Sequence, residues 1–532
     1  MINRNDELFH RRDVLRGSVA AVIGLLAPWS MEVRAQPEPS RIRREVHDPQ
    51  AAPMLELYKR AVRMMRALPP WDSKSWWFQA NIHWLPFADD PQGCYEIGCF
   101  SSLFTAAPDA DQVTRVRIEA ARRLAAGEIP IAPTIGIGED RIWAKCPHGQ
   151  LDFLPWHRLY LHFFEQVVEH LVGEPFALPY WNYLDLNLRD MPLPFRAQFD
   201  ADGSENPLFY PDRNPLTRDP DDPGVPANEK PLIRDQDLQW AIAAQETFFE
   251  RGDVFGLTRG FSTQIEAAPH NPVHGRIGIV VERQGQLVPL GMATPALAAR
   301  DPIFWLHHAN IDRLWQWWRT QSDPPRDPDY IWSLEPYRFA SPDGRAVGLP
   351  AAGALGLVGS AYDYDTLEPV PSAPTPALVA SAERREPRLV GQAIGGVRVD
   401  NAPANVELEA APGREASAVP GRAGGRWFLR LSGIRSAGAP AGVLDVHLDP
   451  GNSPEVIGPP AASFAFFDVA TRDALGESTH AGHHQEERVL DVTERVRALI
   501  EKGADPGALR ITIRPAGNAT PLEIGRIELL SR

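Results

Sequence analysis

Six histidines lie in or beside apolar, aromatic stretches of the sequence, where imidazole side chains are uncommon. They are His83, His148, His157, His270, His274 and His308. A buried imidazole needs a hydrogen-bonding or metal partner. Two groups of such residues are explained more simply by metal ions than by six separate hydrogen-bond arrangements. The residue types therefore predict a metal centre held by imidazole.

The spacing and the donor types narrow the choice of metal. His270 and His274 are four residues apart, so on a helix both rings face the same side. Imidazole ligands suit copper, zinc, iron or nickel. The sequence shows no His-Glu-x-x-His zinc motif and no pattern of two histidines with one carboxylate. Three histidines per metal, twice, favour copper that binds dioxygen; zinc and metal-free histidines stay open as alternatives.

His307 directly precedes His308, and adjacent residues on a helix point about 100° apart. We therefore expect only one of the two to face the metal site. Asp312 follows His308 by four residues and can accept a hydrogen bond from a ligand imidazole or its neighbour. This spacing favours His308.

The elements that must position these residues follow from hydrophobic periodicity. Leu55, Tyr58, Val62 and Met65 recur at helical spacing and predict an amphipathic helix over residues 55–68. Residues 186–231 are rich in Pro, Asp and Asn and predict a long surface loop. Further helices are predicted at 76–83, 113–126, 151–172 and 303–319.

The later part of the chain has a different character. Residues 365–388 form a Pro-rich linker. Beyond the linker, short runs of alternating residues separated by turn signals predict an all-β sandwich. We therefore expect a mainly α catalytic domain at 36–364 and a C-terminal β domain at 389–532. The runs lie at 397–399, 427–431, 443–448, 464–469, 509–513 and 524–530.

Residues 1–35 have the pattern of an export signal. A positive region with Arg11 and Arg12 precedes an apolar run over 17–28 and a small residue, Ala35. This order predicts a cleaved signal peptide, with cleavage after Ala35. The arginine pair favours the twin-arginine route, with an ordinary secretory signal as the alternative. The mature protein is expected to be periplasmic or secreted.

The bulk composition excludes some classes of partner. The net charge of −15 argues against nucleic acid, whose phosphates require a basic surface. No polybasic membrane patch is present, and no segment is apolar for long enough to span a membrane. The three cysteines, Cys94, Cys99 and Cys146, cannot all pair within one chain.

Two stretches carry a family resemblance. Residues 148–165 resemble the first copper signature of the type-3 copper proteins, the family of tyrosinases and polyphenol oxidases, and residues 301–315 resemble the second. Residues 79–83 resemble the segment that carries the first ligand of copper A. The resemblance implies a four-helix bundle around two copper ions. It implies His83, His148 and His157 as ligands of copper A, and His270, His274 and His308 as ligands of copper B.

The resemblance extends over roughly residues 50–530. Tyr362 and Tyr364 resemble the tyrosine motif that closes the catalytic domain of plant polyphenol oxidases. Residues 463–469, 480–484 and 509–513 resemble their C-terminal domain, which shields the active site until it is removed. His480, His483 and His484 are expected in a solvated loop, with weak metal binding as the alternative.

The sequence departs from the family pattern in one respect. Many members have a cysteine soon after the first ligand, joined by a thioether to the second histidine of copper A. Residues 84–87 contain no cysteine. Cys94, Cys99 or Cys146 is left as the candidate, with the other two paired. The long interval between His83 and His148 predicts an inserted segment over the site.

The resemblance implies an enzyme that uses O₂ to hydroxylate monophenols and to oxidise o-diphenols to o-quinones. In the family, a Glu and an Asn matching Glu266 and Asn271 hold a water that is proposed to take the phenol proton. The alternative is that neither residue takes part in catalysis: Glu266 is then a carboxylate in a loop, and Asn271 is a residue at the start of a helix. Small residues at Pro295 and Gly275 predict an open site. A copper-delivery partner is possible besides the phenol and O₂.

Two other functions stay open. The first is a catechol or o-aminophenol oxidase without monophenol hydroxylation, which the presence of Glu266 and Asn271 disfavours. The remote second is an oxygen carrier like the molluscan haemocyanins, which use the same kind of copper site.

Overall fold

The computed structural model of the chain divides into two units, Met1–Ser40 and Arg41–Arg532. All elements below belong to the second unit. The predicted signal peptide, the helix at 113–126, Cys94, Cys99 and the histidines at 480–484 lie outside the described residues. The structure describes residues 41–69, 72–84, 142, 146–225, 230–238, 248, 260–283, 286–321, 336–368, 388–400, 402–411, 426–436, 442–451, 453, 456, 458–465, 467 and 486–531.

Four of the predicted helices are confirmed. They are α2 (Ala52–Ala67), α3 (Trp76–His83), α7 (Phe153–Val172) and α12 (Ile303–Thr320). Ser75 caps α3, because its side chain accepts a hydrogen bond from the backbone N–H of Phe78. α7 ends at Gly173, whose φ of 70° is the left-handed conformation that glycine adopts without strain.

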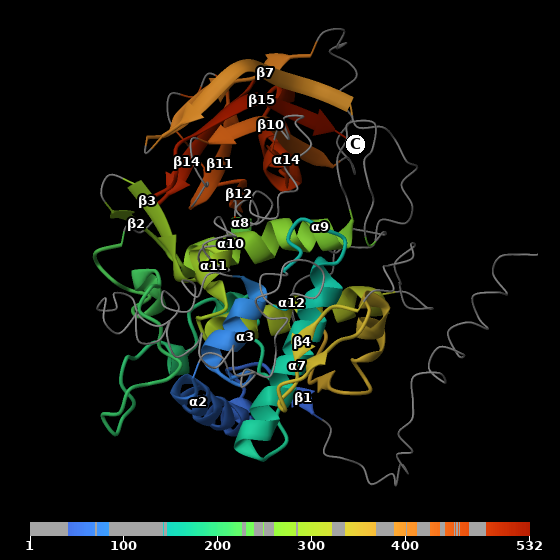
Figure 1. The fold of residues 1–532 in the computed structure, drawn as a ribbon. Coiled ribbons are helices and arrows are strands. Elements are labelled where there is room, and N and C mark those ends of the chain that lie inside the picture. The colour runs from blue at the N-terminus through green and yellow to red at the C-terminus, as the bar shows by residue number, and fades with distance from the viewer. Residues whose placement is uncertain are drawn as a thin grey trace, which may run out of the picture. The chain divides into compact units, whose positions relative to one another are not determined.

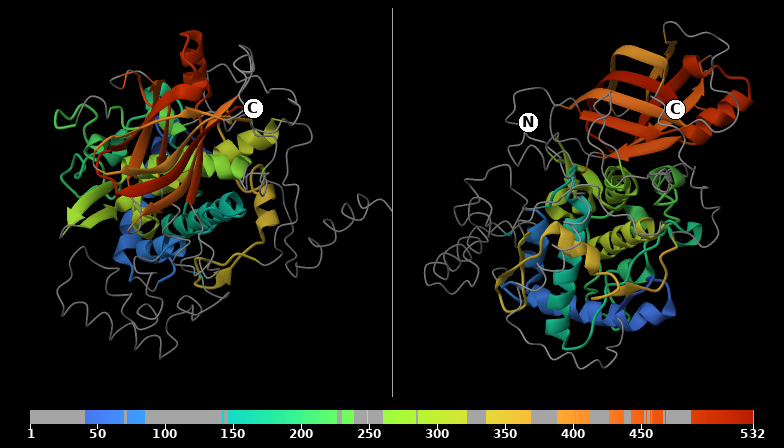
Figure 2. Two further views of the ribbon diagram at one scale, coloured as in Figure 1. Left: turned by 90° about the horizontal axis from the view of Figure 1, so that it is seen from above. Right: turned by 90° about the vertical axis from the view of Figure 1, so that its right-hand side faces the viewer.

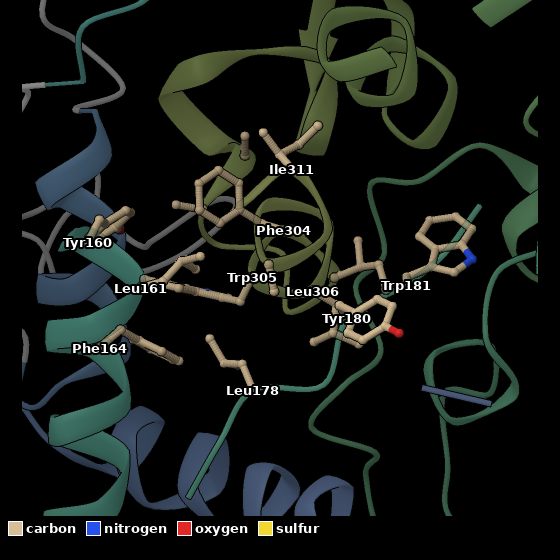
Figure 3. Close-up of a cluster of buried hydrophobic side chains, with 14 of the residues drawn as sticks. Tyr160, Leu161, Phe164, Leu178, Tyr180, Trp181, Phe304, Trp305, Leu306 and Ile311 are labelled. Carbon is tan, nitrogen blue, oxygen red and sulfur yellow. The ribbon is translucent and has the colours of Figure 1, made fainter. Parts of the chain in front are cut away.

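Aromatic side chains fill the core between these helices. The rings of Phe164 on α7 and Trp305 on α12 stack with centroids 3.5 Å apart. Trp76 of α3 packs against both residues, with ring centroids 6.2 Å away in each case. Figure 3 shows Tyr160, Leu161 and Phe164 on one helix beside Phe304, Trp305 and Leu306 on the other. These large buried rings fix how the helices that carry histidines cross.

The segment 260–298 consists of short elements. α9 (Phe261–Ile265), the π-helical turn η8 (Glu266–His270) and α10 (Asn271–Ile277) follow each other, with extended backbone at Ala268 before Pro269. A hairpin of β2 (Ile279–Arg283) and β3 (Gln286–Leu290) follows, then η9 (Gly291–Ala293) and α11 (Pro295–Ala298). Proline interrupts helical hydrogen bonding and explains the break within η8.

The described residues of the C-terminal part form two antiparallel sheets. One has the strand order β13-β10-β15-β7-β9, the other β12-β11-β14-β8. Apolar residues from both sheets form one buried cluster, separate from the helical core. Figure 1 shows β7, β15 and β10 side by side, and Figure 2 shows the orange and red strands in two layers. The strands are β7 (Arg388–Val399), β8 (Ala404–Glu407), β9 (Glu409–Ala410), β10 (Trp427–Ser436), β11 (Val443–Pro450), β12 (Ala462–Ala465), β13 (Glu486–Asp491), β14 (Leu509–Ala516) and β15 (Leu522–Ser531).

The predicted fold class, a mainly α part followed by a β sandwich, is thus confirmed. The sandwich is not purely β, because α14 (Thr493–Glu501) packs against it and buries Val496 and Leu499. The described residues of the predicted loop at 186–231 include three short 3-10 helices. The remaining short elements are β1 (Ile42–Arg43), β4 (Phe339–Ala340), β5 (Ala346–Val347), β6 (Asp363–Tyr364), α8 (Asp235–Leu238), η1 (Pro49–Ala51), η3 (Leu186–Leu188), η4 (Leu193–Phe195), η5 (Pro215–Thr217), η10 (Ala351–Gly356) and η13 (Pro506–Ala508).

Among the described helices, none is both long enough and apolar enough to cross a membrane.

Candidate metal centre

The structure brings all six predicted histidines together in two buried clusters. The first consists of His83, His148 and His157 with Cys146, and the second of His270, His274 and His308 with His307. In each cluster the candidate ligand atoms lie within 4.8 Å of one another. The clusters adjoin: the rings of His157 and His308 stack with centroids 4.3 Å apart.

Each histidine comes from a defined element. His83 is the last residue of α3, and His157 lies in the second turn of α7. His148 lies in the turn before α7. His270 ends η8 and His274 lies within α10, so the predicted helical spacing brings their ring centroids to 4.5 Å. His308 lies on α12.

Backbone carbonyls fix the orientation of three of these rings. The Nδ1 atoms of His83, His157 and His274 lie 3.0, 2.7 and 3.0 Å from the carbonyl oxygens of Pro295, Phe153 and Met292. A carbonyl oxygen only accepts, so Nδ1 carries the proton in each ring and Nε2 keeps its lone pair. Within the described part of the chain, Nε2 of His83 is buried without a hydrogen-bond partner. This is the arrangement that metal-binding imidazoles show.

Burial also keeps the imidazoles neutral. Desolvation is the largest cause and lowers the pKa of His83 to about 3. Desolvation, followed by repulsion from neighbouring imidazoles, places the pKa values of His157, His274 and His308 well below the ordinary value. Neutral imidazole is the form that coordinates metal. Two histidine clusters, in which the described residues place no carboxylate, fit two copper ions.

The expectation that only His308 faces the second cluster is wrong. His307 and His308 both offer a ring nitrogen to it, although adjacent side chains leave the helix in different directions. Nδ1 of His307 lies 3.0 Å from the Tyr183 hydroxyl. The expected support of His308 by Asp312 is not found either. Asp312 instead contacts Arg43, Arg158, Tyr362 and Tyr364, because two guanidinium groups bind a carboxylate more strongly than an imidazole does.

Cys146 is the only one of the three cysteines within the described residues, where it is a free thiol. Its Sγ lies 3.6 Å from Nε2 of His148 and 3.3 Å from Nε2 of His157. Burial, with a smaller effect of Glu266, raises the pKa of the thiol well above its usual range. The sequence left three cysteines as candidates for the thioether, and Cys146 is the one that the described residues place beside His148.

Glu266 and Asn271 are both buried at the second cluster. Oε1 of Glu266 accepts a hydrogen bond from the backbone N–H of Gly149, at 2.6 Å. Oδ1 of Asn271 lies 2.8 Å from Nδ1 of His270. The carboxylate thus bridges the segment that carries His148 and the segment that carries His270.

Sequence reasoning missed Phe467 as a residue of the site. This residue follows β12 in the C-terminal part, yet it belongs to the helical core. Its ring stacks on His274 with centroids 3.9 Å apart and an interplanar angle of 20°. It also meets His148 edge-on at 5.2 Å. The sequence contained one signal for Phe467: it lies in the segment 463–469, which resembles the C-terminal domain that shields the active site in plant polyphenol oxidases.

Comparisons with known proteins agree with this geometry. Residues 74–321 match the family model for the common central domain of tyrosinase. A tyrosinase of Hahella sp. is 28% identical over 412 residues, which are 72% of this chain and 76% of that protein. Aureusidin synthase of Antirrhinum majus is 29% identical over 316 residues, 56% of this chain and 47% of that protein. The chain thus matches about half the length of this plant relative.

The likeness of the fold extends over both parts of the chain. The structure of latent apple tyrosinase superposes with a TM-score of 0.51 at 21% identity, covering 93% of this chain and 98% of that one. The fold, the central domain and the two histidine clusters lead to one assignment. Residues 74–321 belong to the type-3 copper family of tyrosinases and polyphenol oxidases, and the protein is a copper-dependent oxidoreductase with two copper ions as its cofactor.

Proposed function

We propose that this oxidoreductase is a tyrosinase, which hydroxylates monophenols and oxidises o-diphenols to o-quinones with O₂. The two adjoining histidine clusters carry this proposal. In it, His83, His148 and His157 hold copper A, and His270, His274 and His308 hold copper B. The bound copper pair supplies the activation of O₂ and the redox change of the phenol.

The hydroxylation of a monophenol also requires a site for the phenol proton. Glu266 is a buried carboxylate four residues before His270. Because Oδ1 of Asn271 lies at His270, the group that Asn271 can turn towards a water is its NH₂, a donor. A water that donates to Glu266 and accepts from Asn271 would have its lone pair directed to take the proton.

We also propose that the C-terminal part, residues 389–532, shields the site in the mature protein. Phe467 supports this role, because its ring occupies the face of His274 on which a phenol ring would stack. In the same proposal, residues 36–364 form the catalytic domain and 365–388 the linker. Export through the signal at residues 1–35 would place the enzyme outside the cytoplasm, and copper delivery by a partner protein remains part of the proposal.

The test is oxygen uptake by the copper-loaded full chain, before and after limited proteolysis, with tyrosine and then with a catechol. Turnover of both substrates is the expected result. Turnover of the catechol alone would make the chain a catechol oxidase. Reversible O₂ binding without turnover of either substrate would make it an oxygen carrier. Glu266→Gln is the matched variant, and it should lose tyrosine turnover about 100-fold while catechol turnover is retained.

A further inference from the structure

Helix α10 contacts two different parts of the molecule within three residues. His274 belongs to the second histidine cluster, and Arg276 points to the C-terminal sheets. Gly275 lies between them, and a Cβ added there would be 2.5 Å from the side chain of Val443 on β11 and 3.7 Å from Ala465 on β12. Because 2.5 Å is closer than carbon atoms approach, only glycine lets the sheet lie this near to the helix.

Arg276 stands in a buried group of charges that joins both parts of the chain. Its Nη2 lies 2.9 Å from Oδ1 of Asp237 on α8 and 2.9 Å from Oδ1 of Asp445 on β11. Nη2 of Arg234 lies 3.1 Å from the same oxygen of Asp445. Ser463 on β12 donates a hydrogen bond of 2.8 Å to Asp445. All five side chains are buried.

The charges in this group are balanced only while the sheet is in place. Arg234, Arg276 and Asp237 come from the helical part, and Asp445 is the carboxylate that the C-terminal part supplies. Without Asp445, two guanidinium groups would face a single carboxylate. A buried ion pair often adds little net stability over an apolar contact, but it fixes the relative position of the surfaces that it joins.

The segment of α10 that carries Arg276 and the segment that carries Ser463 also hold Phe467 against the histidines. Residues 274–276 face residues 463–467: Arg276 contacts Ser463 at one end, and His274 stacks on Phe467 at the other. A shift of the sheet at the ion group therefore moves the ring that covers His274.

We propose that Arg234, Arg276 and Asp237 form a latch that captures Asp445 and Ser463 and thereby keeps Phe467 seated over the copper site. This inference rests on the proposed shielding function and names the contacts that maintain it. Opening the latch, without cutting the chain, is then sufficient to admit substrate.

The test compares three copper-loaded full-length proteins: the wild type, Asp445→Asn and Asp449→Asn. Asp449 is the matched control, because it is also buried on β11 but pairs with Arg495 inside the C-terminal part, at 2.8 Å. Catechol oxidation is measured before and after limited proteolysis, together with copper content. Neither variant changes the helical part, so all three proteins should have equal activity after cleavage.

The expected result is that Asp445→Asn is about tenfold or more as active as the wild type before cleavage, while Asp449→Asn stays latent. An Asp445→Asn protein as latent as the wild type would overturn the latch while leaving the shield intact, provided that proteolysis still activates both. If proteolysis activates none of the proteins, the shield itself is wrong and the latch with it.

A milder variant covers the case in which Asp445→Asn does not fold. Ser463→Ala removes one hydrogen bond to Asp445 and leaves the charges in place. It should show a smaller activation in the same direction, and it should be cleaved by protease faster than the wild type. No change in either quantity would contradict the latch.

Discussion

At the scale of residues, the site depends on which nitrogen of each imidazole carries the proton. Carbonyl oxygens of Pro295, Phe153 and Met292 hold the Nδ1 protons of three histidines. The rings therefore present Nε2 in a fixed direction before any metal arrives. Such preorganisation reduces the cost of ordering the site when copper binds.

Replacement of one such ligand should remove one copper ion. His157→Ala is expected to bind about half the copper of the wild type and to lose oxidase activity, because three imidazoles are needed to hold each ion. The measurement is copper per chain by metal analysis. His170→Ala is the control, since His170 lies on the same helix but is exposed. Full copper occupancy in His157→Ala would remove this residue from the ligand set.

Cys146 is expected to form the thioether with His148. The bond joins Sγ to a carbon of the His148 ring. The S–H and C–H hydrogens leave as two protons and two electrons, and O₂ at the copper site accepts the electrons. The peptide that contains both residues should be two hydrogens lighter than its sequence mass. Cys146→Ser should lack this bond and still bind copper. The protein is first loaded with copper and then unfolded. Full reaction of Cys146 with a thiol reagent at that point would contradict the prediction.

At the scale of elements, Asp312 joins segments that are far apart in the sequence. It pairs with Arg43 of β1 at 3.0 Å and with Arg158 of α7, and it accepts hydrogen bonds of 2.6 Å from Tyr362 and Tyr364. Burial by itself raises the pKa of Asp312, but the two arginines and the two tyrosine hydroxyls together lower it below its usual value. The tyrosine motif thus closes the helical part by anchoring to the helix that carries His308.

Asp312→Asn should destabilise the fold strongly, because it leaves two buried guanidinium groups without their carboxylate. The expected loss is about 3–5 kcal/mol in the free energy of unfolding. Urea unfolding of the copper-free protein would measure it. Asp363→Asn, an exposed position on β6, should change the free energy by less than about 0.5 kcal/mol. Similar effects of the two substitutions would show that the buried network does not stabilise the helical part.

At the scale of the whole molecule, the buried histidines link stability to pH. The pKa values of His83, His157, His274, His307 and His308 are all lowered by burial in the folded, copper-free protein. The unfolded chain therefore binds more protons than the folded one below the ordinary histidine pKa of 6.5. Stability is highest above that value and is lost as the pH falls towards about 3, the pKa of folded His83.

The copper-free protein should accordingly unfold at a lower urea concentration at a pH of about 5.5 than at about 7.5. An equal or higher urea midpoint at the lower pH would contradict the prediction.

The helices that carry the site, and the histidines that lie in it, leave local patterns that are visible in the sequence. The periodicity of residues 55–68 and the aromatic runs at 151–172 and 303–319 predicted α2, α7 and α12, because amphipathic and buried helices leave a local pattern. The spacing of His270 and His274 likewise predicted a shared face. These features depend on neighbours within a few residues, and such neighbours are visible in a sequence.

The contacts between distant segments leave no such local pattern and come from the tertiary fold. In the structure, Asp312 contacts two arginines instead of His308, and His307 lies in the second cluster together with His308. The fold also brings Cys146 to His157, and Phe467 and Asp445 to α10. Each of these contacts depends on how helices and sheets cross, and crossing is set by side-chain packing over the whole core rather than by local spacing.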